Sequence, residues 1–230
     1  MQVIRLMPFR GGFINALAYH VLNRGVEKRE IFVDVYDYKR FVEILGEFNS
    51  DKPTHFHVIR RERRYRNLPK SIKRDKGNEL VDIICFCLMP NHFHLLLRQK
   101  VNNGIATFMM KVCTGYASYF NKRYGRSGTL FQGRYKALLV KDDVHFSHLT
   151  CYIHSNPLKI LPGKKPASEL LKRYRWSSYG DFIGEPKYEK LASPKNTLDY
   201  IGGIENYKKM IDEYGENKFC PDLISELILE

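Results

Sequence analysis

The chain has 230 residues, enough for one sizeable hydrophobic core or for one core with a small appendage. Hydrophobic residues make up 43% of the sequence and charged residues 27%, and this balance excludes an intrinsically disordered protein. The formal net charge of +13 favours a polyanionic partner, above all nucleic acid. An anionic membrane surface is the competing partner, but the basic residues are interleaved with Tyr, Phe and Gly and do not line one side of an amphipathic helix.

No apolar run approaches the roughly 20 residues that span a bilayer. The first 15 residues also lack the apolar stretch and small-residue cleavage site of a secretory signal. The sequence therefore predicts a cytoplasmic protein with no membrane partner. The five cysteines are an odd number without framework spacing, so we expect reduced thiols that pack in the core.

The N-terminal part of the chain predicts a strand followed by a helix. Residues 18–23 alternate as a strand does, and Arg24 with the glycine after it ends the pattern. Apolar positions then recur at helical spacing up to Asn49, and Asp34 or Asp37 can cap the first helical turn. The predicted order is therefore β then α.

Two polar segments follow this helix. Residues 60–76 contain nine basic and two acidic side chains, and form either a solvated loop or an inserted arm that contacts nucleic-acid phosphates. Just before them, His55 and His57 form a His-x-His pair. Because this pair lacks a long apolar continuation, we interpret it as a strand edge and not as a metal-binding pair.

The centre of the chain predicts a β-hairpin that carries two histidines. Residues 81–88 and 92–98 are apolar runs joined by a tight Met-Pro-Asn turn, which is typical of two buried strands. His92 and His94 are two residues apart, so their side chains lie on one face of the second strand. Two imidazoles in this arrangement can bind a divalent metal.

A long helix and an extended segment come next. Residues 104–124 follow a helical period, and residues 129–140 favour extended structure with a break at Gly133. Aromatic and basic side chains alternate here, a mixture that suits single-stranded nucleic acid, whose bases stack on rings while its phosphates contact cations. The candidate contacts, in order of preference, are Arg134, Lys136, Arg24, Arg126 and Lys122.

The following helix carries a candidate nucleophile. Residues 143–155 are predicted to be helical, and Pro157 stops the helix. Tyr152 and Asn156 are four residues apart and therefore face the same way. A phenol can attack a phosphate, and an amide oxygen can join two imidazoles on a metal. These residue types together indicate a metal-dependent nuclease.

The C-terminal part, residues 161–230, is predicted to be a helical extension that packs on a main domain of residues 1–160. It begins with a Pro/Gly/Lys linker and has helical patterns around 176–183 and 207–214. Residues 199–230 contain three Lys and eight acidic residues, a net charge of −5, which argues against a DNA contact there.

Five stretches, in this order, resemble the HUH-superfamily single-tyrosine transposases of the insertion-sequence 200 type, and within them the REP-associated tyrosine transposases. The stretches are AYHVLNRG at 18–25, CLMPNHFHLLL at 87–97, YFNKRYGRSGTLFQGRYKA at 119–137, YIHSNP at 152–157 and YRWSSYGDFIG at 174–184. One His-x-His motif is weak evidence alone, whereas the ordered set is specific and spans most of the chain.

The resemblance implies an α+β fold, the ferredoxin-like HUH palm, with a central, mainly antiparallel sheet, helices on one face and the histidines in the middle of the sheet. It implies that His92, Phe93 and His94 are the HUH motif and that Tyr152 is the nucleophile. It also implies that Asn156 completes the metal site, where many relatives carry Gln. The implied metal is Mg²⁺ or Mn²⁺.

The implied activity is that of a single-stranded DNA endonuclease and strand transferase acting on hairpin-bearing DNA, such as an insertion-sequence end or a REP-type palindrome. Attack by Tyr152 would leave a 5′-phosphotyrosine link and a free 3′-hydroxyl, and the reverse reaction would join strands. A homodimer is also implied, in which the tyrosine helix can serve the partner's metal site.

Two alternative functions are compatible with the same sequence. The first is a DNA- or RNA-binding regulator, domesticated from a transposase, with the same fold and no catalysis. The second is a zinc-stabilised interaction protein, because Cys85 and Cys87 share a strand face and could bind zinc together with His92 and His94. Against the zinc site, cysteines in a buried strand usually pack as small apolar groups.

Overall fold

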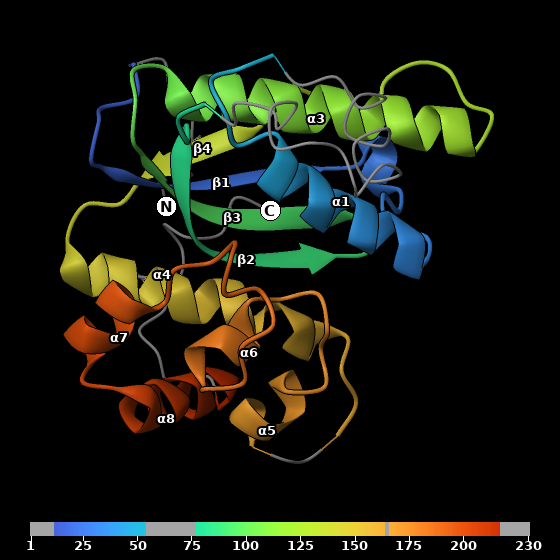
Figure 1. Cartoon of the computed structure of the whole chain (residues 1–230). Coiled ribbons are helices and arrows are strands. Elements are labelled where there is room, and N and C mark those ends of the chain that lie inside the picture. Colours follow the sequence, from blue (N-terminus) through green and yellow to red (C-terminus); the bar gives the residue numbers. More distant parts are fainter. Residues whose placement is uncertain (1–11, 54–76, 164–165, 217–230) are drawn as a thin grey trace, which may run out of the picture.

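The centre of the molecule is a four-stranded sheet with the order β2-β3-β1-β4 (Figure 1). The computed structural model describes residues 12–53, 77–163 and 166–216. The strands are β1 (Ala18–Arg24), β2 (Val81–Met89), β3 (His92–Gln99) and β4 (Lys136–Leu139). Each pair of neighbouring strands is antiparallel. The predicted α+β class with a central antiparallel sheet is therefore confirmed, and β3 lies inside the sheet.

Two helices cover the first face of the sheet, α1 (Val35–Glu47) and α3 (Gly104–Arg123) (Figure 1). Alternate strand residues point into this layer, and Phe93 and Leu95 are fully buried there against side chains of both helices. Asp34 caps α1 by accepting hydrogen bonds from the first helical turn, which is where the sequence predicts the helix to begin. We call this side of the sheet the apolar face.

The second face is covered by α4 and by the helices that follow it (Figure 1). These elements are α4 (Asp143–Ser155), the 3-10 helix η3 (Asn156–Lys159), α5 (Ala167–Leu171), α6 (Tyr179–Phe182), α7 (Lys195–Ile201) and α8 (Ile204–Gly215). Cys85, Cys87 and Leu96 of the strands share one buried cluster with residues of these helices. We call this side the histidine face, because it carries His92 and His94.

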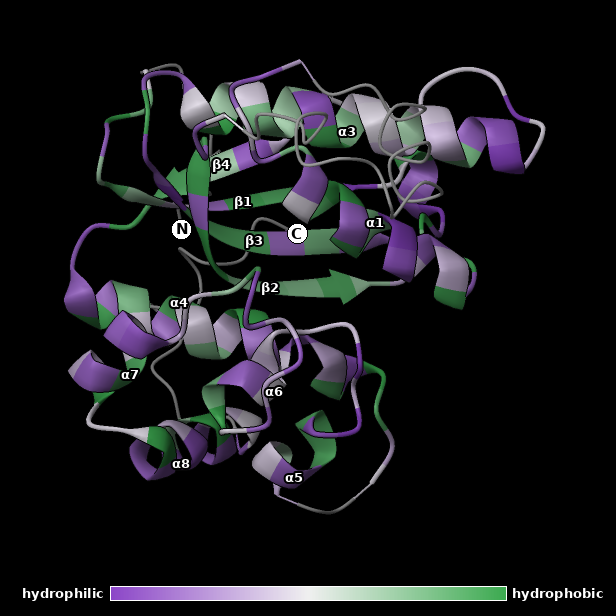
Figure 2. Ribbon diagram, in the orientation of Figure 1, coloured by the Kyte–Doolittle hydropathy of each residue, from purple (hydrophilic) through white to green (hydrophobic). Residues whose placement is uncertain are grey.

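The helices thus cover both faces of the sheet, whereas the sequence analysis expects them on one. The reason is visible in Figure 2, where the central strands are largely hydrophobic while the helices carry both hydrophobic and hydrophilic residues. A strand that is apolar on both sides must be buried on both sides. The helices after Ala167 supply that second cover together with α4, and the division of the chain at residue 160 stays a prediction.

Most predicted elements are present, with a difference in the segment 129–140. Only its last part forms a strand, β4, while Phe131 makes a single bridge to Gly25. The second His-x-His pair at 55–57, the basic run 60–76 and the end of the acidic tail lie outside the described residues. Among the residues that the structure describes, no helix is both long and apolar enough to cross a membrane.

The Met-Pro-Asn turn between β2 and β3 is held by the segment that follows β1. The backbone amides of Ile31 and Phe32 donate to the Pro90 carbonyl, at 2.8 and 3.0 Å, and the Gly25 amide donates to the Asn91 carbonyl at 2.8 Å. A Cβ at Gly25 would lie 2.3 Å from the Arg29 carbonyl oxygen, so the tight path of the chain after β1 requires glycine at this position. The turn fixes where β3 starts, and hence where its histidines lie.

Candidate active site

Three histidines and one tyrosine meet on the histidine face. The ring centroids of His92 and His94 are 5.0 Å apart. The Tyr152 ring meets the His94 ring edge-on at 5.7 Å and the His20 ring at 6.1 Å. All four side chains are buried, with Tyr152 the most exposed at 7%. The structure therefore brings the predicted nucleophile and the predicted metal-binding pair together within a single chain.

Strand register and helix capping produce this meeting. His92 and His94 lie on one face of β3 because strand side chains alternate, and Leu22 of β1 pairs with His94 across the strands. His20, two residues before Leu22, therefore shares that face. On the other side, Asp142 caps α4 through a 2.7 Å hydrogen bond from the His145 amide, so α4 begins where the sequence predicts.

The hydrogen bonds of Asn91 orient the His92 ring. The Asn91 side-chain nitrogen donates to the Lys28 carbonyl at 3.1 Å, so its oxygen is the atom that faces His92. That oxygen lies 2.6 Å from His92 Nδ1, which must therefore be the donor. A neutral imidazole with its proton on Nδ1 keeps a lone pair on Nε2, the form needed to bind a metal.

His20 plays the corresponding part for His94. Nε2 of His20 lies 2.9 Å from Nδ1 of His94, and the two rings are nearly parallel. When His20 accepts through Nε2, His94 carries its proton on Nδ1 and its Nε2 can bind a metal. The two predicted ligands thus fit a divalent cation, with both Nε2 atoms as donors and Asn91 and His20 as their supports.

The third predicted ligand, Asn156, is buried and bonded to its own helix. Its side-chain nitrogen donates to the Tyr152 carbonyl at 2.9 Å. Its oxygen, the only atom of the amide suited to a cation, accepts a 3.4 Å hydrogen bond from Lys159. Ligation by Asn156 stays a prediction, and it would require the Lys159 ammonium to give way.

Lys159 also lies beside the predicted nucleophile. Its ammonium is 6.0 Å from the centre of the Tyr152 ring. A cation in this place could neutralise negative charge on a phenol oxygen or on a phosphate. The sequence analysis did not single out Lys159, although its place three residues after Asn156, in the turn that follows the tyrosine helix, was a usable signal.

The zinc alternative loses support in the structure. Cys85 and Cys87 are completely buried in the cluster on the histidine face, and burial raises the pKa of both thiols. Zinc needs thiolates, which this environment disfavours. Within residues 12–53, 77–163 and 166–216, no group of three or more His, Cys, Asp or Glu side chains could hold a metal ion. The predicted set of His92, His94 and Asn156 is of another kind, because its third member is an amide.

The predicted DNA contacts fall into two groups. Arg24 pairs with His92 across β1 and β3, and Lys136 pairs with Leu22 across β1 and β4, so both belong to the histidine face by register. Lys122 and Arg126 lie at the end of α3, on the apolar side of the sheet, and the Arg126 guanidinium stacks over the Phe120 ring at 5.7 Å. Arg134 is exposed in the segment before β4.

His20 is the residue of this site that sequence reasoning missed. It lies 74 positions before His94, in a strand whose other buried residues are mostly apolar. A polar residue in a buried strand was the available signal, since such a group is normally kept for a hydrogen-bonding role. Only the pairing of β1 with β3 shows which partner it has.

Comparison with known proteins identifies the central part of the chain. The family model described as "Transposase IS200 like" matches residues 54–156. The match covers less than half of the chain, and this part of it is similar to IS200-like transposases. The match supports an enzyme that cuts and joins DNA. The matched residues include His92, His94, Tyr152 and Asn156, whereas His20 and Arg24 precede them.

Comparisons over the whole length of the chain identify it less clearly than the family model does. No curated protein matches the chain. Among solved structures, the chain is similar to a REP-associated tyrosine transposase bound to a REP hairpin. The sequence identity is 12% and the TM-score 0.49, over 82% of this chain and 89% of that one.

Proposed function

We propose that this protein is a transposase, a metal-dependent single-stranded DNA endonuclease and strand transferase that uses Tyr152 as its nucleophile. The observation that carries the proposal is the edge-on packing of the Tyr152 ring against His94, 5.7 Å between centroids, inside one chain. A phenol beside two oriented imidazoles has the chemistry of phosphodiester cleavage. The match of residues 54–156 to IS200-like transposases supports the same conclusion.

The reaction is a transesterification. The Tyr152 oxygen attacks phosphorus, and the bond from phosphorus to the 3′ oxygen breaks. The departing oxygen takes up a proton and becomes a free 3′-hydroxyl, while the phenol releases its proton and holds the 5′ end as a phosphotyrosine. Because the number of phosphoester bonds is unchanged, attack by a 3′-hydroxyl in the reverse direction joins two strands.

The cation of this site would be Mg²⁺ or Mn²⁺, bound by Nε2 of His92 and of His94, with Asn156 as the proposed third ligand. When bound, it would polarise a nonbridging phosphate oxygen and so make phosphorus more open to attack. Imidazole suits Mn²⁺ better than Mg²⁺, which prefers oxygen ligands. Asn91 and His20 would hold the two rings in the ligand form through their hydrogen bonds.

The substrate would be an unpaired strand next to a hairpin. Tyr152 and the histidines are almost fully buried, which favours a flexible single strand over a stiff duplex as the DNA that reaches them. Arg24 and Lys136 belong to the same face by register and would contact its phosphates. Since one chain holds the phenol and both imidazoles, a homodimer would not be needed to bring them together.

The proposed location is the cytoplasm, as the sequence predicts. Four of the cysteines, Cys85, Cys87, Cys113 and Cys151, are free thiols in the structure. Reduced thiols are typical of that compartment.

Covalent capture tests the proposal. The purified protein is incubated with Mg²⁺ or Mn²⁺ and a labelled library of hairpins with single-stranded flanks, and a denaturing gel separates protein-linked DNA. We expect an adduct with the wild type and with Tyr200→Phe, a control at an exposed tyrosine, and none with Tyr152→Phe. If the wild type forms no adduct with any hairpin, the regulator is favoured; an undiminished adduct with Tyr152→Phe would show that another residue attacks.

A further inference from the structure

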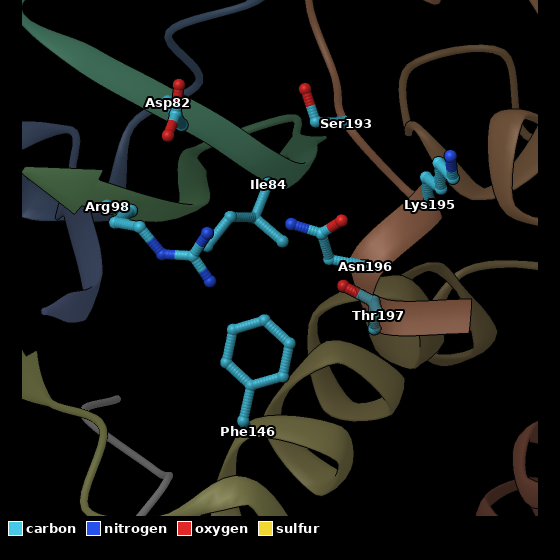
Figure 3. A pocket seen from close by; sticks show the side chains of 8 residues that line it. All are labelled: Asp82, Ile84, Arg98, Phe146, Ser193, Lys195, Asn196 and Thr197. Atoms are coloured by element: carbon cyan, nitrogen blue, oxygen red, sulfur yellow. The ribbon is translucent and has the colours of Figure 1, made fainter. Parts of the chain in front are cut away.

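A second polar site lies on the histidine face, at the other end of α4 from Tyr152. It is a cavity of about 340 Å³ between the sheet, α4 and the start of α7 (Figure 3). This volume is at the lower end of the range of small-ligand sites, roughly 300–1,000 Å³. Among the residues that line it are Asp82, Arg98, Phe146, Asn196 and Thr197.

The cavity belongs to the same side of the sheet as the candidate active site. Arg98 follows His94 by four residues on β3 and shares its face, about 13 Å away at roughly 3.3 Å per residue. Phe146 precedes Tyr152 by six residues on α4, about 9 Å along the helix axis at roughly 1.5 Å per residue. Both distances are short enough for a few nucleotides of one strand to span.

The cavity combines a cationic side chain, an aromatic ring and neutral polar groups. In the described part of the chain, the Arg98 side chain makes no hydrogen bond or ion pair, although it is half-buried. Asp82, which faces it across β2 and β3, is instead 3.2 Å from the Lys100 ammonium. Figure 3 shows the Arg98 guanidinium, the Phe146 ring and the Asn196 amide directed into one space. Such a guanidinium suits a phosphate, and the ring suits a base.

We propose that this cavity binds an unpaired nucleotide of the strand that is cut at Tyr152. The base stacks on Phe146, the phosphate meets Arg98, and the Asn196 amide and the Thr197 hydroxyl hydrogen-bond the edge of the base. The inference rests on the proposed function for its substrate. At about 3.4 Å per stacked nucleotide, a distance of about 9 Å corresponds to roughly three nucleotides. The cavity thus contributes to the choice of cleavage site.

Binding can be measured apart from cleavage in the Tyr152→Phe background. The probes are a fluorescein-labelled hairpin with a single-stranded arm of about ten thymidines, and the same hairpin without the arm. We expect Phe146→Leu and Arg98→Gln each to weaken binding of the armed hairpin about tenfold, as the loss of a stacked base or a phosphate contact does. Binding of the bare hairpin should stay within about twofold. Arg173→Gln, at an exposed arginine outside the cavity, is the matched control and should leave both unchanged.

Photocrosslinking locates the nucleotide directly. With 5-iododeoxyuridine placed at each arm position in turn, we expect one position to crosslink to Phe146, identified by mass spectrometry. Thermal unfolding of each variant checks that it folds. The proposal is overturned if the Tyr152→Phe protein with an unaltered cavity binds the armed hairpin no better than the bare one. It is equally overturned if both cavity variants bind the armed hairpin as tightly as the Tyr152→Phe protein does and no crosslink falls in the cavity.

These results separate the two proposals. Loss of arm binding in the variants, without any covalent adduct from the wild-type protein, would retain the nucleotide site and reject the nuclease. A Tyr152-dependent adduct, together with unchanged arm binding in both variants, would retain the nuclease and reject the nucleotide site.

Discussion

The two faces of the sheet are built from the same strands and differ in how they are held. On β3, Phe93 and Leu95 point to the apolar face, where they are fully buried among aliphatic and aromatic side chains. His92 and His94 alternate with them and point to the histidine face, where hydrogen bonds orient them. The apolar face gains stability by burial, whereas the histidine face holds polar groups in fixed positions at some cost in burial energy.

A polar cluster at the edge of the apolar face shows the other use of buried polar groups. Asp37 is buried, and its carboxylate accepts hydrogen bonds from Tyr119 at 3.0 Å, Tyr124 at 2.7 Å and Arg123 at 2.9 Å. One guanidinium and two phenols of α3 and its end converge on this carboxylate of α1, which ties the two helices together. The cluster therefore stabilises the fold, while the histidines present nitrogen atoms to the space beside Tyr152.

The largest expected effect comes from the histidine face. His94→Gln should lower covalent adduct formation roughly a thousandfold, since a bound cation contributes several kcal/mol to the transition state. The free energy of unfolding should change by about 1 kcal/mol or less, because glutamine can still hydrogen-bond. Gel quantification of the adduct and urea unfolding measure the two. A large loss of stability with normal adduct formation would assign His94 to the core.

A substitution of Leu95, the next residue on β3, should lower stability and leave adduct formation unchanged. Leu95→Ala removes a fully buried side chain and should cost about 2–5 kcal/mol of unfolding free energy. The folded fraction should form adduct at the wild-type rate, because Leu95 points away from Tyr152. Urea unfolding gives the first value and single-turnover kinetics the second. If stability were unchanged, the division between the two faces would fail.

A smaller effect is expected from His20. His20→Phe keeps a ring beside Tyr152 but removes the acceptor for His94, and should weaken Mn²⁺ binding about 10–100-fold. His20→Gln, which restores an acceptor, should recover part of the affinity. Titration calorimetry measures the affinity, and ¹⁵N shifts of His94 report without any metal which ring nitrogen carries the proton. Equal affinity in all three proteins would leave His20 with a packing role only.

The pH dependence of stability separates His154 from the other histidines of this face. Burial lowers the pKa of His154 to about 3, and its ring nitrogens lie 2.5 Å from the Tyr207 hydroxyl and 2.8 Å from the Ser178 hydroxyl. An unfolded histidine has a pKa near 6.5. Between about pH 6.5 and pH 3 the unfolded chain therefore binds a proton that the folded chain does not. Stability should fall with falling pH by roughly 1 kcal/mol per unit from this group.

The measurement for His154 is urea unfolding at a series of pH values. His154→Gln, which cannot take up this proton, should show a flatter dependence below pH 6.5 than the wild type. The same slope in both proteins would show that His154 does not titrate as its burial requires.

The sequence alone determined the parts of the molecule that depend on local periodicity. Alternation at period two predicted β2 and β3 and placed His92 and His94 on one face, and a four-residue spacing placed Tyr152 and Asn156 together. Caps and breakers gave the helix ends within a residue or two, because the orphan amides of a helix end need a nearby acceptor.

The tertiary structure decided what joins residues far apart in the chain. The contact of His20 with His94 depends on the register of β1 against β3, and the nucleotide cavity on where α7 meets α4 and the sheet. The second layer of helices is needed because the strands are apolar on both sides. The periodicity of a strand does not show which elements cover each side. Such contacts arise from chain-wide packing and strand pairing, which local sequence patterns do not encode.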